Sequence, residues 1–168
     1  MKCLSLQRIL LITVFMKHTI TLLTAALMLM QISCTQSESE TKKHIETTTT
    51  HFAEAYFNYD FKLALKYSAP ESYKWIRYAA TNVTESDLEK LRSKEENATV
   101  GIERIEMNNT DSTGIVTIKV NDYLCQDTIG QPGHIIECCT FRIPVVIREN
   151  RCLVKMEGPL RSEKRNPD

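Results

Sequence analysis

The amino-acid sequence predicts an α+β fold, in which N-terminal helices pack on a curved antiparallel sheet of about four strands. From Gly114 to Glu157, apolar residues recur at every second position. This pattern is typical of strands with one buried face and one solvated face. Between residues 45 and 91, apolar residues recur at helical spacing instead. Because the helices precede the strands and do not alternate with them, the order favours an α+β fold.

The first expected helix covers residues 45–59. Four consecutive threonines, 47 to 50, weaken its N-terminal half, because β-branched side chains lose rotamer freedom in a helix. We still expect it to dock across the sheet, since burying a large apolar side chain is worth roughly 1.5–3 kcal/mol. Its apolar face carries Ile45, Phe52, Ala53 and Tyr56.

Three shorter helices are expected to follow. Asp60 is placed to cap the first of them. Ser68 and Glu71 have the spacing of a capping box, with Pro70 in the first turn, and should open the next helix. Residues 84–87 start a strongly charged helix, which we expect to be a solvated cover over one edge of the fold.

Four strands are expected after the helices. The first, from Ala98 to Met107, changes the phase of its alternation, which is how a β-bulge reads in a sequence. Alternation in the later strands assigns these residues to the inward face: Val116, Ile118, Val120 and Leu124; Cys139, Phe141, Ile143, Val145 and Ile147; Cys152, Val154 and Met156.

Residues 1–33 are expected to be a signal peptide, with the true start of translation at Met16. Two apolar runs, 9–16 and 20–30, flank Lys17, and each is shorter than the roughly 20 residues of a membrane-spanning helix. A single anchor through both runs would bury Lys17 at mid-bilayer, at a cost of about 2.5–3.5 kcal/mol. The second run therefore reads as the core of a secretory signal.

The end of this signal resembles that of a bacterial lipoprotein. Ser33 and Cys34 follow the apolar core directly, although Gln31 stands where the family usually has leucine. The resemblance implies that the Cys34 thiol is acylated and that residues 34–43 tether a domain to the membrane. Thr35, and not aspartate, follows the cysteine, and the resemblance then implies sorting to the outer membrane, with the domain on its periplasmic side or at the cell surface.

Residues 45–160 resemble the nuclear transport factor 2-like, or cystatin-like, cone. The resemblance is carried by the long first helix, by the run YFNYDFKLALKYSAPES into shorter helices, and by a bent sheet that ends in NRCLVKM. Where that family often has a W-x-V pattern, this chain has Cys152 and Val154. We take residues 44–160 as the domain and expect residues 161–168 to form a disordered tail with nothing to bury.

Charge and motifs exclude several classes of function. The first 33 residues hold three of the 21 basic residues and no acidic one, which leaves 18 basic against 21 acidic residues. This mildly acidic balance argues against nucleic-acid binding. The sequence has no P-loop, GxGxxG, GxSxG or Ser-His-Asp pattern, and its histidines lack metal-ligand spacing. We therefore expect neither a cofactor nor a metal, and no catalytic residue is assigned.

Asp122 interrupts the inward stripe of its strand. A buried carboxylate is costly, so Asp122 must titrate abnormally, find a partner or leave the inward face through a bulge, which we favour. If it points inward, it lies near the open end of the cone. Tyr56, Trp75 and Phe141 are then the candidate walls of a small-molecule site.

Cys125 and Cys138 fall on the polar face of their strands. A hairpin centred between Gln131 and Pro132 would set the two cysteines opposite each other, where an oxidising compartment permits a disulfide. A turn made by Pro132 and Gly133 would instead set Cys125 against Thr140. Both registers stay open from the sequence.

These features favour a non-enzymatic cell-envelope lipoprotein that is anchored to the membrane through Cys34 and binds a small molecule or an envelope protein. The alternative is a cone-pocket enzyme of isomerase or hydratase type, which would use Asp122 with Tyr56 or Tyr78. An open pocket with convergent polar groups would favour the enzyme, and a filled one the binding protein. The oligomeric state, including a dimer, stays open.

Overall fold

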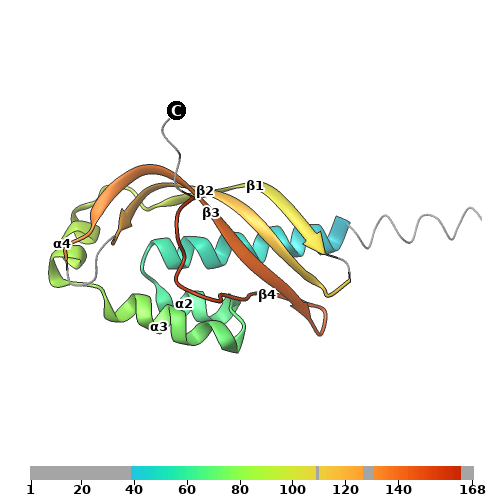
Figure 1. Cartoon of the computed structure of the whole chain (residues 1–168). Coiled ribbons are helices and arrows are strands. Elements are labelled where there is room, and N and C mark those ends of the chain that lie inside the picture. The colour runs from blue at the N-terminus through green and yellow to red at the C-terminus, as the bar shows by residue number, and fades with distance from the viewer. Residues whose placement is uncertain (1–38, 109, 127–130, 164–168) are drawn as a thin grey trace, which may run out of the picture. The chain divides into compact units, whose positions relative to one another are not determined.

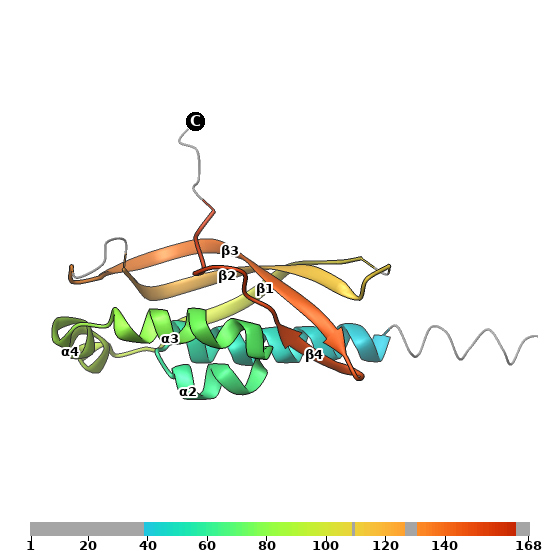
Figure 2. The ribbon, with the colours of Figure 1, turned by 60° about the horizontal axis from the view of Figure 1, so that its bottom comes forward.

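The computed structural model describes residues 39–108, 110–126 and 131–163 of the chain. The chain divides into two units, Met1–Lys42 and Lys43–Asp168. In the second unit, helices form one layer and a curved antiparallel sheet forms the other (Figures 1 and 2). The predicted α+β fold is therefore confirmed. The expected signal peptide and the acylation site at Cys34 lie outside the described residues.

The sheet has the strand order β1-β2-β3-β4, with every neighbouring pair antiparallel. Its strands are β1 (Thr99–Asn108), β2 (Thr113–Cys125), β3 (His134–Arg148) and β4 (Arg151–Val154). The predicted bulge lies in β1, where the register with β2 shifts between Ile102 and Arg104. The change of phase in the sequence therefore marked a real irregularity of the strand.

The inward face of the sheet is the one that alternation predicted. Its buried members are Val116, Ile118, Val120, Phe141, Ile143, Val145, Cys152, Val154 and Met156. Leu124, which we also expected on this face, is buried but does not belong to the core cluster, which contains its neighbour Tyr123 instead. Cys139 and Ile147 are half-buried at the ends of the same stripe. Together these side chains form the floor on which the helices pack.

The alignment of β2 with β3 differs from both predicted registers, and the loop between these strands is longer than a tight turn. Val120 lies opposite Cys139, and Cys125 lies opposite His134. The register centred between Gln131 and Pro132 would have set Val120 against Ile143 and is wrong by four residues; the register with a Pro132–Gly133 turn is wrong by six. Because both numbers are even, these shifts leave the same side chains on the inward face.

The helical layer begins with an N-terminal helix that ends at residue 57 and contributes residues 43–57 to the folded unit. It continues with α2 (Phe61–Ala64), the 3-10 turns η1 (Leu65–Tyr67) and η2 (Pro70–Ser72), α3 (Tyr73–Thr81) and α4 (Glu85–Ser93). Asp60 caps α2 as predicted, because its carboxylate accepts a hydrogen bond from the Leu63 N–H at 2.9 Å. Within the described residues, no helix is long and apolar enough to cross a membrane.

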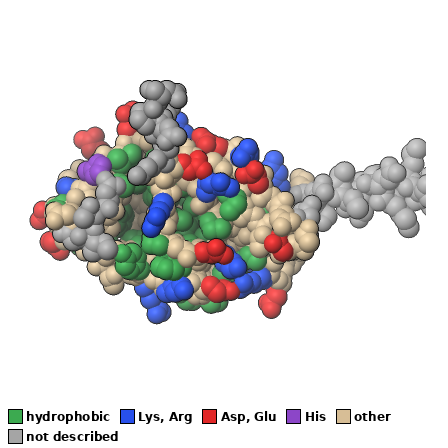
Figure 3. All heavy atoms as spheres, in the orientation of Figure 1, with side chains coloured by type: hydrophobic (Ala, Val, Ile, Leu, Met, Phe, Trp, Pro, Cys, Tyr) green, Lys and Arg blue, Asp and Glu red, His purple; other side chains and the backbone are tan. Residues whose placement is uncertain are grey.

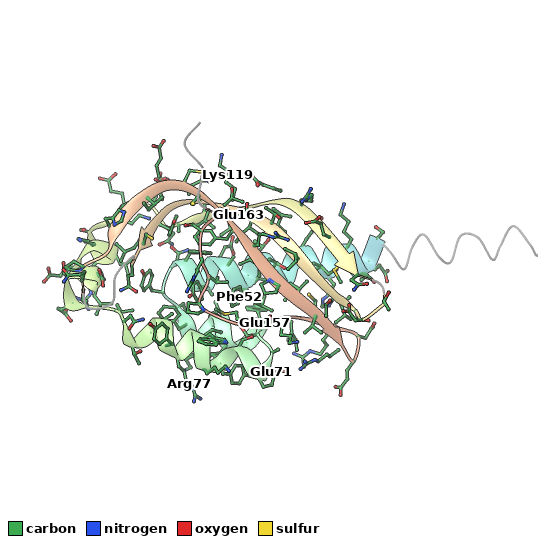
Figure 4. All side chains as sticks on the ribbon, in the orientation of Figure 1. Phe52, Glu71, Arg77, Lys119, Glu157 and Glu163 are labelled. Atoms are coloured by element: carbon green, nitrogen blue, oxygen red, sulfur yellow. The ribbon has the colours of Figure 1, made fainter. Side chains whose placement is uncertain are left out.

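The N-terminal helix docks on the inward face of the sheet. Ile45, Phe52 and Ala53 are buried, and Tyr56 is half-buried. Figure 4 shows Phe52 between the sheet and the helices, whereas Lys119 projects from the opposite face of the sheet. The burial of this apolar face therefore compensates for the low helix propensity of the four threonines, as we expected from the sequence.

The capping box predicted at Ser68 does not form. The Ser68 hydroxyl donates to the Ala64 carbonyl at 2.8 Å, and Glu71 makes an ion pair with Arg148 at 2.6 Å. The helical turn begins instead at Pro70, without a side-chain cap. This prediction failed because both polar side chains find partners outside the turn, in the preceding helix and in β3.

Ser72 attaches this segment to the end of the sheet. Its buried hydroxyl donates to the Val154 carbonyl at 2.9 Å and accepts a hydrogen bond from the Met156 N–H at 2.8 Å. The Ala69 N–H also donates to the Val154 carbonyl, at 2.8 Å. These bonds hold α3, which follows directly, against the sheet.

Thr49 should be replaceable by valine with a gain in stability. Its side chain is fully buried. Among the described residues, its hydroxyl is the one buried side-chain nitrogen or oxygen atom without a hydrogen-bond partner. We expect Thr49→Val to raise the free energy of unfolding by about 1 kcal/mol, because it replaces an unpaired hydroxyl with a methyl group. Urea unfolding measures the change, with the exposed Thr47→Val as control. A less stable Thr49→Val protein would contradict this account.

Candidate functional site

A cavity of about 530 Å³ lies between the helices and the inward face of the sheet. Its walls come from the N-terminal helix, α2, α3, β2, β3 and the C-terminal segment. Figure 3 shows hydrophobic side chains gathered in a hollow on this side of the domain, with charged side chains around them. Several lining residues are aromatic, among them Tyr56, Phe61, Tyr78, Tyr123 and Phe141.

Two of the four residues that we expected at a small-molecule site line this cavity. Tyr56 and Phe141 are brought together by the docking of the N-terminal helix on β3. Trp75 is not among the lining residues; it is half-buried on α3, and the Lys74 Nζ lies 4.9 Å from its ring centroid. Tyr78, three residues further along α3, takes the place that we expected for Trp75.

Asp122 lies outside the cavity. It is exposed, and its φ of 52° places its backbone in the left-handed region. Pairing of β2 with β3 continues on both sides of it without a change of register, but Val120 and Tyr123 are both buried. The strand therefore changes phase at Asp122 and turns the carboxylate away from the core. Its assignment to the pocket was wrong, and the escape from the inward face that we favoured occurs through this backbone conformation.

The end of the N-terminal helix is locked to the start of β1, which fixes the tyrosines on either side. The Asn58 side chain donates to the Ala98 carbonyl at 3.0 Å and accepts from the Ala98 N–H at 2.7 Å. Directly after it, Tyr59 adopts a φ of 65°, and its hydroxyl donates to the Leu124 carbonyl at 3.0 Å. Tyr56 and Tyr59 are thereby held in the cavity wall from both sides.

Three tyrosines of the cavity wall, Tyr56, Tyr59 and Tyr123, are neutral phenols at physiological pH. Burial raises the pKa of Tyr56 to about 12. Burial also raises the pKa of Tyr59, with a further contribution from the nearby Asp87 carboxylate, and that of Tyr123, which lies beside two cysteine thiols. Phenols of this kind offer apolar ring faces and neutral hydroxyl groups. They do not serve as bases near neutral pH.

Asp87 fixes another part of the wall and was not anticipated as a buried residue. Its carboxylate accepts hydrogen bonds from the Thr84 N–H at 2.8 Å, from Gln126 Nε2 at 2.8 Å and from the Gly133 N–H at 2.7 Å. Burial acts to raise the pKa of Asp87, but these hydrogen bonds and one from the Thr84 hydroxyl outweigh it and lower the pKa to about 2. Asp87 therefore connects α4 to both ends of the β2–β3 loop.

Gly133 is required where it meets Asp87. A Cβ atom at this position would lie 2.6 Å from the Cys125 carbonyl oxygen and 3.2 Å from Asp87 Oδ1. The first distance is shorter than a real Cβ contact tolerates, so the chain at residue 133 approaches the end of β2 this closely only because glycine stands there. Helix α4, which we expected to be a solvated cover over one edge of the fold, is attached to the chain before β3 at this point.

The C-terminal segment forms the remaining wall, with Pro159 to Ser162 lining the cavity. Ser162 pairs with Phe141 across an antiparallel bridge, and the Glu163 N–H donates to the Thr140 carbonyl at 2.9 Å. Residues 161–163 were expected to be disordered, which is wrong, because the free edge of β3 supplies backbone partners for them. Residues 161–163 are polar, so the sequence contains no pattern of apolar residues from which this attachment could be predicted.

The predicted disulfide between Cys125 and Cys138 is absent. The register places Cys125 opposite His134 and Cys138 opposite Asn121, so the cysteines are four positions apart along the strand pair. Four positions correspond to roughly 13 Å, beyond the roughly 7 Å that a disulfide bridges. The longer loop between β2 and β3 causes this separation.

Within the part of the chain that the structure describes, no group of metal-ligating side chains is present.

Comparison with known proteins does not assign the cavity. No family model, no curated protein and no solved structure matches the chain. The residues of the cavity itself are therefore the basis on which we assign a function.

Proposed function

We propose that this protein is a non-enzymatic lipoprotein of the cell envelope whose domain binds a small, largely apolar molecule. The observation that carries the proposal is the aromatic cavity of about 530 Å³. Its volume falls within the roughly 300–1,000 Å³ of small-molecule sites, which are lined mainly by apolar and aromatic side chains with a few polar groups. Asn82 and Gln126 are such polar groups in its wall.

The cavity is open, as we expected for an enzyme, but its lining favours binding over catalysis. General acid–base chemistry needs a group that titrates near the working pH. Among the described lining residues there is no carboxylate and no histidine, and the pKa of the Tyr56 phenol is raised by burial to about 12. The alternative of an isomerase or hydratase depended on Asp122, which is exposed and does not line the cavity.

The surface favours a small molecule over a protein partner. Protein-binding sites usually present a contiguous apolar patch of several large side chains. Among the described residues, only Tyr78 and Ile135 are large hydrophobic side chains that are exposed, at 39% and 43%. Tyr78 belongs to the cavity itself, so the apolar surface that is available for recognition lies within the cavity.

The membrane anchor is the second part of the proposal and rests on the sequence. Ser33 and Cys34 end an apolar signal core, and the resemblance to lipoprotein signals favours acylation of Cys34. Two or three acyl chains are sufficient for stable anchoring, whereas one chain is marginal. We therefore place the domain at the outer membrane, with the short polar stretch after Cys34 as its tether.

Filling the cavity should abolish binding of an apolar probe. Ala79 lines the cavity, whereas the next residue of α3, Ala80, is exposed and does not. We expect the chain to bind the neutral fluorescent probe phenylnaphthylamine, and Ala79→Phe to weaken this binding by about tenfold or more, because the new ring occupies the space of the ligand. Fluorescence titration measures both affinities.

Ala80→Phe is the matched control, since it adds the same side chain one position away, outside the cavity. We expect it to bind the probe as the unmodified chain does. Thermal unfolding of both variants verifies that each is folded. Equal affinities of Ala79→Phe and Ala80→Phe, or no binding by the unmodified chain, would refute the proposed site.

A further inference from the structure

We infer that the ligand of this cavity carries one acidic group, and that Arg161 binds it. The inference rests on the proposed function of the cavity and adds the chemical class of the ligand. A carboxylate, sulfonate or phosphate on an apolar body fits this description. The argument depends on the charge of the wall, on the position of Arg161 and on the chemistry of its side chain.

Arg161 gives the cavity wall its charge. Among the described lining residues it is the single Lys, Arg, Asp or Glu. The other charged side chains of the described residues do not line the cavity. An anionic ligand would therefore meet one positive charge and no negative charge in this wall.

The Arg161 guanidinium is also available for a ligand. Four other arginines of the described residues have carboxylate partners: Arg92 with Glu85, Arg104 with Glu106, Arg142 with Glu163 and Arg148 with Glu71. Arg77 and Arg151 have no such partner among the described residues, but neither of them lines the cavity. Arg161 makes no ion pair with any residue that the structure describes. Its neighbour Glu163 is already engaged by Arg142 at 3.8 Å.

The backbone around Arg161 is fixed before any ligand binds. Ser162, the next residue, pairs with Phe141, and Leu160, the preceding one, packs against the core. Phe141 is itself a lining residue, so the arginine is attached beside the aromatic wall. Because this segment is already ordered, binding costs little backbone entropy.

Arginine and the neighbouring tyrosines suit an amphipathic acid. A guanidinium stays charged at all physiological pH values and binds carboxylates, sulfonates and phosphates through parallel hydrogen bonds. The apolar body of the ligand would lie against the rings of Tyr56 and Tyr78. We therefore assign the site to an aromatic or aliphatic acid of one negative group, and not to a neutral lipid or a cation.

Two probes that differ by one sulfonate test this inference. Phenylnaphthylamine is neutral, and anilinonaphthalenesulfonate carries one negative charge on the same ring system. We expect the unmodified chain to bind the sulfonate more tightly, and Arg161→Gln to weaken binding of the sulfonate about tenfold while changing that of the neutral probe less than about twofold. Added salt should weaken only the binding of the sulfonate.

Arg77→Gln is the matched control. Arg77 is exposed on α3, one residue before Tyr78, and is not a lining residue; Figure 4 shows it pointing away from the domain. We expect this variant to bind both probes as the unmodified chain does. Arg161→Lys keeps the charge but loses the parallel hydrogen bonds, so its affinity for the sulfonate should lie between those of the unmodified chain and Arg161→Gln.

The outcomes separate this inference from the proposed function. If Arg161→Gln and Arg77→Gln bind the sulfonate equally well while Ala79→Phe still blocks the neutral probe, the inference is wrong and the apolar site stands. If neither probe binds the unmodified chain, both proposals are refuted. Equal loss of both probes in Arg161→Gln would show a structural effect on the wall and would also overturn the inference.

Discussion

Replacing Asp87 with alanine is expected to lower the free energy of unfolding by about 3 kcal/mol. Hydrogen bonds to a charged group are worth about 1.5–3 kcal/mol each, and the loss of a helix cap costs about 0.5–2 kcal/mol. Asp87→Ala leaves donors of Thr84, Gln126 and Gly133 without their common acceptor. Because these losses are not additive, we expect less than their sum. Urea unfolding measures the change.

Glu89→Ala is the control for the removal of an acidic side chain from the same helix. Glu89 is exposed on α4, so its replacement should change the free energy of unfolding by less than about 0.5 kcal/mol. If Asp87→Ala were as mild as Glu89→Ala, the buried carboxylate would not be the connection between α4 and the β2–β3 loop.

The same carboxylate should make stability depend on pH between about 4 and 2. The pKa of Asp87 in the folded protein is about 2, below its ordinary value of 3.8. The unfolded chain therefore takes up the proton first as the pH falls, and the contribution of Asp87, complete above about pH 4, is lost as the pH approaches 2. Asp87→Asn should show a smaller decrease in stability across this window. Parallel pH profiles of the two proteins would contradict the assignment.

Replacing Cys34 with alanine is expected to release the protein from the membrane completely. If Cys34 carries the acyl chains, its thiol is the sole attachment point, and each buried methylene contributes about 0.8 kcal/mol to membrane affinity. The variant should appear in the soluble fraction after cell lysis, and the unmodified protein in the detergent phase. Intact-mass measurement of the membrane-bound form should show the mass of the acyl groups on a chain that begins at Cys34.

Cys138→Ala controls for the loss of a cysteine, because Cys138 is exposed on the folded domain and far from the signal. It should remain in the membrane fraction. A Cys34→Ala protein that still partitions with the outer membrane would eliminate the lipid anchor and would leave the proposed ligand site untouched.

The sequence predicted which side chains of the strands face inward, but not how the strands align. Alternation placed Val116, Ile118 and Val120 on the inward face, where all three are buried. It could not distinguish the observed register from one shifted by four residues, because even shifts preserve the faces. The register depends instead on the length of the β2–β3 loop, which Asp87 holds through Gln126 and Gly133.

The cavity was only partly predictable, because segments that are far apart in the sequence build it. The phase of the N-terminal helix pointed to Tyr56, and the phase of β3 pointed to Phe141. The left-handed backbone conformation of Asp122 interrupts the strand locally, and the alternation of apolar residues does not predict it. Arg161 lies in a charged run that reads as a solvated tail, so its place in the wall became visible only with the bridge between Ser162 and Phe141.

The two outer edges of the sheet are protected from pairing with other chains in different ways. Beyond β4, the Ala69 N–H occupies the Val154 carbonyl, so a strand of another molecule finds this edge already taken. Beyond β1, no strand of the described residues is present, and this edge depends on its bulge and on the exposed charges of Glu103, Arg104 and Glu106. Bulges and charges on an open edge oppose the stacking of strands into aggregates. For a protein that would be held at high local concentration on a membrane, β1 is therefore the edge at which pairing between neighbouring molecules must be opposed, far from the core that stabilises the fold.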